Sequence, residues 1–164
     1  MSDGDGVTNL YLYKTLKHSI KCSNLFIGVF SSDNMNVKKL KMKKEFILIC
    51  NLSPQRHIGT HFVTIVANER EILYCDSLAL PINTSNKLFK NLKNIRKKIT
   101  NFVKRPIQAS LSNFCGIYCM YFVALFDHKR FPHIIRQKKF VKHYLKKNDF
   151  ICVNNLKELL MQNT

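Results

Sequence analysis

The chain has 164 residues and 46% hydrophobic side chains, which suffices for one sizeable core and leaves little room for a second domain. Lys and Arg number 27 against 10 Asp and Glu, so the net charge of +17 predicts an affinity for polyanions. No apolar run approaches the ~18–20 residues of a membrane helix, and residues 1–6 lack the layout of a secretory signal, which argues against a membrane-bound or secreted protein. We expect one monomeric domain over residues 1–164, with residues 1–8 as a mobile tail.

The first half of the chain predicts one helix followed by short strands. Residues 9–21 carry apolar side chains at helical spacing, which indicates an amphipathic helix with these residues on its buried face: Leu10, Tyr13, Leu16 and Ile20. Apolar runs of strand length follow at residues 25–30, 45–51, 61–67 and 71–76. We expect these runs to form a small mixed, largely antiparallel sheet.

The second half predicts mainly helices. Residues 83–100 indicate a second amphipathic helix, and its apolar face would contain Leu88, Leu92, Ile95 and Ile99. Residues 102–109 include Pro106, which is compatible with an edge strand. Residues 115–127 are almost entirely apolar and predict a central, buried helix, followed by helices over about 134–147 and 154–161.

The two strands around Asn68 predict a base and its orienting group. If Asn68 and Glu69 form a two-residue hairpin loop, His61 lies directly opposite Asp76. Opposed Cβ atoms in an antiparallel pair lie ~4.5–5.5 Å apart, so the carboxylate could accept the imidazole N–H. An imidazole held in this way is suited to serve as a general base beside a thiol.

The candidate nucleophile is Cys115, which the pattern places in the first turn of the central helix. The partial positive charge of a helix N-terminus favours thiolate over thiol and directs backbone N–H groups toward a developing oxyanion. Gly116 would permit a close approach of substrate backbone. The alternative for Cys115 is a buried apolar side chain that begins a core helix.

The remaining cysteines and histidines are expected to be structural. The chain has six cysteines but no CxxC pair, so neither a zinc knuckle nor a disulfide framework is indicated. Cys119 lies one helical turn after Cys115, yet no second pair of metal ligands follows at suitable spacing, and core packing is favoured. Four histidines are expected in loops or on the surface: His57, His128, His133 and His143.

The order His61, Asp76, Gln108, Cys115-Gly116 resembles the adenovirus-type cysteine proteases (adenain-like), which are related to the proteases of SUMO and other ubiquitin-like proteins. The seven-residue step from Gln108 to Cys115 is similar to the adenovirus branch. The resemblance also covers the segment 22–33. Papain-like enzymes are excluded, because in their sequences the catalytic cysteine precedes the histidine. It implies an α+β fold with a mixed sheet packed against the central helix, and cleavage of viral precursor polyproteins in the virion or in the host nucleus or cytoplasm. It also implies that Gln108, with Cys115 and Gly116, holds the oxyanion.

Three features of the sequence depart from the family pattern. Phe62 stands where these proteases usually have Trp after the catalytic histidine, and the chain after about Phe131 has no counterpart. No cysteine lies between Ser77 and Ile107, so a peptide activator linked through a cysteine there cannot be carried over.

Cofactor and partner expectations follow from the charge together with the resemblance. No metal or organic cofactor is expected, while DNA and a peptide activator are the candidate cofactors. Lysine-rich segments at 38–44, 87–105 and 129–147 could track phosphates, and the residues proposed to contact DNA are Lys93, Lys97 and Lys98. The alternative for each segment is a solvated helix face.

Two other functions remain open at this point. One is a protease that removes ubiquitin-like modifiers, which would share the same catalytic residues. The other is a basic DNA-packaging or capsid-associated protein without catalysis, because a net charge of +17 would by itself support binding to nucleic acid.

Overall fold

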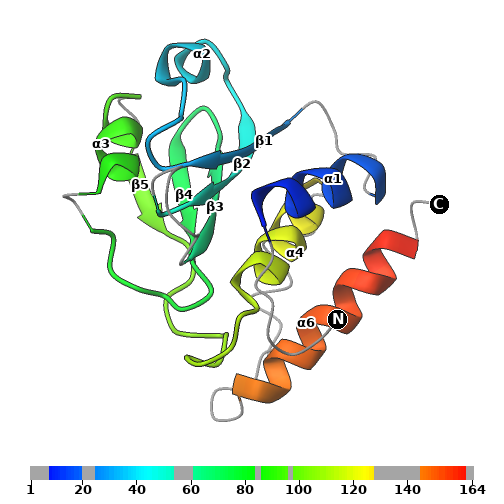
Figure 1. The fold of residues 1–164 in the computed structure, drawn as a ribbon. Helices are drawn as coiled ribbons and strands as arrows, with labels where there is room; N and C mark the ends of the chain where they lie inside the picture. Colours follow the sequence, from blue (N-terminus) through cyan, green and yellow to red (C-terminus); the bar gives the residue numbers. More distant parts are fainter. Residues whose placement is uncertain are drawn as a thin grey trace.

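The computed structural model describes residues 8–19, 25–53, 61–83, 86–95, 98–127 and 145–161. Helices and strands are both present, so the predicted α+β class is confirmed (Figure 1). The described elements, in chain order, are α1 (Asn9–Ser19), β1 (Phe26–Ser31), α2 (Val37–Lys41), β2 (Phe46–Asn51), β3 (Phe62–Ala67), β4 (Glu71–Cys75), α3 (Lys87–Lys93), β5 (Lys98–Asn101), α4 (Cys115–Asp127) and α6 (Leu145–Met161).

The five strands form one sheet in the order β1-β2-β3-β4-β5. The inner pairs β2–β3 and β3–β4 are antiparallel, whereas β1–β2 and β4–β5 are parallel. The expectation of a mixed sheet is therefore confirmed, but its description as largely antiparallel is wrong. The physical reason lies in the connections, because α2 and α3 cross over between the paired strands and return the chain in the same direction.

Alternating side chains along the strands produce two separate cores, one on each face of the sheet. In β2, Ile47 and Ile49 face the layer that contains α1 and α4, while Leu48 and Cys50 face α2 and α3. Every residue of β2 and β3 is buried, as expected for central strands covered on both faces. The sheet is thus a middle layer between two helical layers (Figure 1).

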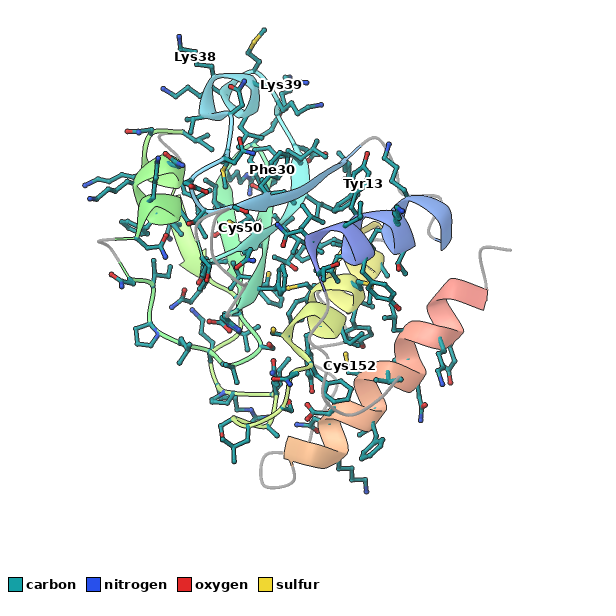
Figure 2. The ribbon with its side chains drawn as sticks, viewed as in Figure 1. Tyr13, Phe30, Lys38, Lys39, Cys50 and Cys152 are labelled. Carbon is teal, nitrogen blue, oxygen red and sulfur yellow. The ribbon has the colours of Figure 1, made fainter. Side chains whose placement is uncertain are left out.

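The apolar helix α4 lies at the centre of the larger core, as predicted. Residues 118–125 of α4 are all buried, and α4 packs against β3 on one side and α6 on the other. Cys152 of α6 is fully buried, and Figure 2 shows it on the side of α6 that faces α4. Within the described ranges, no helix combines the length and apolarity needed to cross a membrane.

The structure corrects the predicted buried face of α1. Leu16 is fully buried as predicted and Leu12 is fully buried as well, whereas Leu10 is 60% exposed and Tyr13 is 39% exposed. Both stripes have helical spacing, and the contacts of α1 with β1 and α4 decide which stripe turns inward. The end of the predicted helix, residues 20 and 21, and most of the predicted mobile tail lie outside the described residues.

Two further predictions between residues 83 and 109 are wrong. The expected long helix is divided into the short helix α3 and the strand β5, and residues 102–109 form bends and coil instead of the expected edge strand. Leu88 and Leu92 are buried as predicted, but Ile99 packs against the same core from β5. Pairing of β5 with β4 satisfies backbone groups that a helix would have satisfied internally.

The predicted C-terminal helices also differ from the structure. The helix α6 begins at Leu145, nine residues before the predicted start at Asn154. Most of the helix expected over 134–147 lies outside the described residues, and residues 145–147 form the first turn of α6.

Candidate active site

His61 and Asp76 come together at one end of the central hairpin. His61 directly precedes β3 and Asp76 directly follows β4, and the distance from His61 Nε2 to Asp76 Oδ1 is 2.7 Å. Both side chains are buried, with exposed fractions of 8% and 2%. Asp76 Oδ1 also accepts the backbone N–H of Leu78 at 2.8 Å, which fixes the carboxylate in the turn after β4.

The pairing of His61 with Asp76 is confirmed, but the predicted strand register is wrong. The prediction pairs Thr64 with Leu73, whereas the structure pairs Thr64 with Cys75. The side chain of Asn68 accepts the backbone N–H groups of Arg70 and Glu71, each at 2.8 Å, so the loop residues are Glu69 and Arg70.

This shift by two residues preserves the predicted contact for a simple reason. Side chains alternate between faces with a period of two, so an even shift keeps His61 and Asp76 on the same face. The two residues are diagonal neighbours instead of directly opposed ones. A diagonal Cβ separation of ~7–8 Å is still within reach of an imidazole and a carboxylate.

Cys115 is the first residue of α4, and its thiol lies close enough to the His61 imidazole for each group to shift the pKa of the other. Burial would raise the pKa of the Cys115 thiol, but hydrogen bonds with His61 and with the backbone N–H groups of Phe62 and Gly116 lower it below its ordinary value. Burial would likewise lower the pKa of His61, yet its hydrogen bonds to Asp76 and Cys115 raise that pKa to about 9. Both shifts favour a thiolate beside an imidazolium.

The other described cysteines provide an internal comparison. Burial raises the pKa of Cys50 to about 12, and it also raises the pKa of Cys75, Cys119 and Cys152. All four are free and buried, as predicted for structural cysteines, whereas Cys115 is half-buried. Cys22 and the histidines at 57, 128, 133 and 143 lie outside the described residues.

Gln108 is buried, and both ends of its amide group are held. Its Oε1 accepts the hydroxyl of Ser77 at 2.5 Å, and its Nε2 donates to the backbone carbonyl of Ser112 at 2.7 Å. The backbone N–H of Gln108 also donates to the Ser77 carbonyl at 3.1 Å. Since an amide nitrogen has two protons, one Nε2 proton remains after the bond to Ser112.

Ser77 is a residue of the site that the sequence analysis did not identify. It lies next to Asp76 in the chain and holds Gln108 through side chain and backbone, so it links the acidic residue of the site to the glutamine. Its adjacency to Asp76 was visible in the sequence. Its contact with a residue 31 positions away could be seen only in the folded chain.

The lysines proposed to contact DNA do not share one helix face. Lys93 is exposed at the end of α3, Lys98 is exposed at the start of β5, and Lys97 lies outside the described residues. The predicted helix over residues 83–100 would have carried all three lysines, but this prediction is wrong because α3 ends at Lys93. Within the described part of the chain, no group of three His, Cys, Asp or Glu side chains could hold a metal ion.

No family model matches this chain, and no curated protein matches it in sequence. The geometry of the described residues is therefore the basis for the functional proposal that follows.

Proposed function

We propose that this protein is a cysteine endopeptidase in which Cys115 is the nucleophile, His61 the base and Asp76 the group that orients the imidazole. The observation that carries the proposal is the arrangement at the start of α4, where Asp76 holds the His61 imidazole at 2.7 Å and the imidazole lowers the pKa of the neighbouring Cys115 thiol. Among the five described cysteines, Cys115 alone has a pKa below the ordinary thiol value. A thiol activated by an imidazole and a carboxylate is the arrangement required for nucleophilic acyl transfer.

In the proposed reaction, the Cys115 thiolate attacks the carbonyl carbon of the scissile peptide and a C–S bond forms. The carbonyl electron pair moves to oxygen, where the remaining Nε2 proton of Gln108 and the backbone N–H of Cys115 would stabilise the negative charge. The C–N bond then breaks, and the imidazolium of His61 transfers its proton to the leaving amine. Water, deprotonated by His61, hydrolyses the thioester and regenerates the thiolate.

Asp76 fixes which nitrogen of His61 faces the thiol. Because Nε2 is bonded to the carboxylate, Nδ1 is left for Cys115. Burial lowers the pKa of His61, but the same carboxylate stabilises the protonated imidazole and raises that pKa above its ordinary value. We propose viral precursor proteins as the substrate class, because the residue order resembles that of adenovirus-type proteases.

An irreversible thiol reagent provides the test that separates an enzyme from a binding protein. We expect chloroacetamide to modify Cys115 near neutral pH much faster than any buried cysteine, because only an accessible thiolate reacts quickly. Peptide mapping by mass spectrometry identifies the modified residue. Equal rates at Cys115 and Cys119 would contradict the proposed active site and would favour the non-catalytic alternative.

Gln108 should behave as a transition-state residue. We expect Gln108→Ala to lower kcat by ~10²–10³-fold with little change in KM, since the lost donor acts mainly on the oxyanion. The measurement is steady-state cleavage of a peptide selected from a library. A higher KM with unchanged kcat would instead place Gln108 in the substrate groove.

A second proposed activity, binding of DNA without sequence preference, is favoured by the surface of α2 and α3. These two helices contain no acidic residue, and their lysines are all exposed: Lys38, Lys39, Lys41, Lys87, Lys90 and Lys93. Figure 2 shows Lys38 and Lys39 projecting outward from α2. Both helices cover the face of the sheet opposite α4, so DNA bound there would leave the candidate active site open.

We expect the double variant Lys93→Glu, Lys98→Glu to weaken DNA binding and any stimulation of cleavage by DNA. Each lost phosphate contact should reduce the slope of log affinity against log salt concentration by roughly 0.9. Fluorescence anisotropy with a random-sequence duplex measures both quantities. The control variant Lys14→Glu, Lys17→Glu makes the same charge change on α1, and an equal loss of binding in this control would show that net charge alone determines affinity.

A further inference from the structure

Asp149 is a buried acid in the first half of α6 that lies against the segment carrying Gln108. Its side chain is 5% exposed, although α6 is a surface helix whose other described acid, Glu158, is exposed. Burial raises the pKa of the Asp149 carboxyl, while hydrogen bonds from the Ser112 and Tyr118 side chains and from the Ala109 backbone N–H act in the opposite direction. A buried carboxyl with several polar partners has a cost that apolar packing would avoid.

The contacts of Asp149 converge on residues 107–112. Tyr118 Oη lies 3.0 Å from Asp149 Oδ1 and 2.9 Å from the carbonyl oxygen of Ile107, so the single phenol proton lies between two acceptors. The Ser112 hydroxyl donates to the Ala109 carbonyl at 3.0 Å, which closes the turn within this segment. Asp149 thus reaches the segment at Ile107, through the Tyr118 phenol.

Gln108 lies in the middle of this segment and depends on it for its orientation. The bond from Gln108 Nε2 to the Ser112 carbonyl, at 2.7 Å, determines where the second Nε2 proton is directed. Ser77 holds the opposite end of the amide from the turn after β4. The amide is therefore held by Ser77 on the side of the sheet and by its own segment on the side of α6, and Asp149 anchors that segment from α6.

We propose that Asp149 is a positioning residue for the oxyanion donor, and that α6 is a functional part of the active site through this contact. Asp149 acts by holding residues 107–112, which keeps Gln108 Nε2 directed toward the reacting carbonyl. This role rests on the proposed peptidase function. It also assigns a task to a part of the chain that has no counterpart in the family pattern described above.

The test compares three variants of the full chain with a matched control. Asp149→Ala removes the anchor, Asp149→Asn keeps its size and one acceptor, and Tyr118→Phe removes only the phenol group that links Ile107 to Asp149. Glu158→Ala removes an exposed acid from the same helix. We expect Asp149→Ala to lower kcat by ~10–100-fold, less than loss of the Gln108 donor, because Ser77 still holds the amide.

Two readouts separate positioning from a general loss of structure. KM and the alkylation rate of Cys115 should stay within about twofold of wild type in Asp149→Ala, since the thiolate and its base are not touched. Asp149→Asn and Tyr118→Phe should retain more kcat than Asp149→Ala. Should Asp149→Ala fail to fold, these two variants supply the same comparison, and unchanged kcat in both of them would overturn the proposal.

Amide hydrogen exchange distinguishes failure of this inference from failure of the proposed function. We expect faster exchange over residues 107–112 in Asp149→Ala and unchanged exchange in Glu158→Ala. If exchange of this segment is the same in Asp149→Ala and wild type, Asp149 does not hold it and the inference is wrong. If exchange increases while the wild-type protein cleaves no peptide, the anchoring role stands and the peptidase function fails.

Discussion

Replacing Cys115 by alanine is expected to reduce peptide cleavage by roughly 10⁵–10⁶-fold and leave the fold intact. The sulfur forms the covalent bond to substrate, and the loss of a nucleophile from a catalytic triad removes most of the rate enhancement that the triad provides. Cys115 is half-buried at the start of α4, so its truncation should have little effect on the core. Cleavage of a library-selected peptide and the melting temperature are measured on the same preparations.

Cys119→Ala is the matched control for this experiment. Cys119 lies one turn further along α4 and is buried, and its pKa is raised by burial. We expect this variant to lose some stability through the small cavity it creates, while its cleavage at a temperature well below melting stays close to wild type. Cleavage by folded Cys115→Ala at more than a small fraction of the wild-type rate would rule out Cys115 as the nucleophile.

Replacing His61 by alanine is expected to be almost as damaging, because no other group of the described site can take the thiol proton. Asp76→Asn should reduce kcat by about 10⁴-fold, since an amide can still contact the imidazole but favours the wrong tautomer. The ranking of Cys115→Ala, His61→Ala and Asp76→Asn is measured under one set of conditions. If His57→Ala abolishes cleavage and His61→Ala does not, the assignment of the base is wrong.

The pH dependence gives an independent check on His61. In the wild type, kcat/KM should rise as Cys115 ionises, below the ordinary thiol pKa of 9.0, and should fall as pH increases through about 9, where the imidazolium of His61 loses its proton. The two groups are coupled, so the apparent values belong to the pair. In His61→Ala, the midpoint for alkylation of Cys115 should move upward, because burial is then opposed only by the backbone hydrogen bonds.

Much of the site was accessible from local patterns in the chain. The alternation around Asn68 identified the hairpin, and the apolar run after residue 114 identified the helix that begins at Cys115. Both are local signals, since strand and helix periodicity are set by backbone geometry within a few residues. The contact between His61 and Asp76 was predicted correctly although the predicted register was wrong by two residues. An even shift leaves each side chain on the same face of the sheet.

Other features could not be predicted because competing patterns are equivalent before the chain folds. Residues 83–100 have helical spacing throughout, but the last three positions of that region, 98–100, became part of β5 because β4 offered an unpaired edge. In α1, packing against β1 and α4 buried Leu12 beside the predicted Leu16 and left Leu10 and Tyr13 exposed. Long-range contacts decided both outcomes.

The sequence by itself determined the central helix beginning at Cys115 and the placement of His61 and Asp76 on one face of the hairpin, since both depend on residue type and short-range periodicity, while the α+β class followed from the resemblance of the residue order. Only the tertiary structure decided that the outer strand pairs are parallel, that Ser77 bonds to Gln108, and that Asp149 of α6 is linked to Ile107 through Tyr118. The physical reason is that a hydroxyl or a carboxyl has no periodic pattern that reveals its partner. Its hydrogen bonds are set by which surfaces the apolar layers bring together, and that is settled when the two cores form.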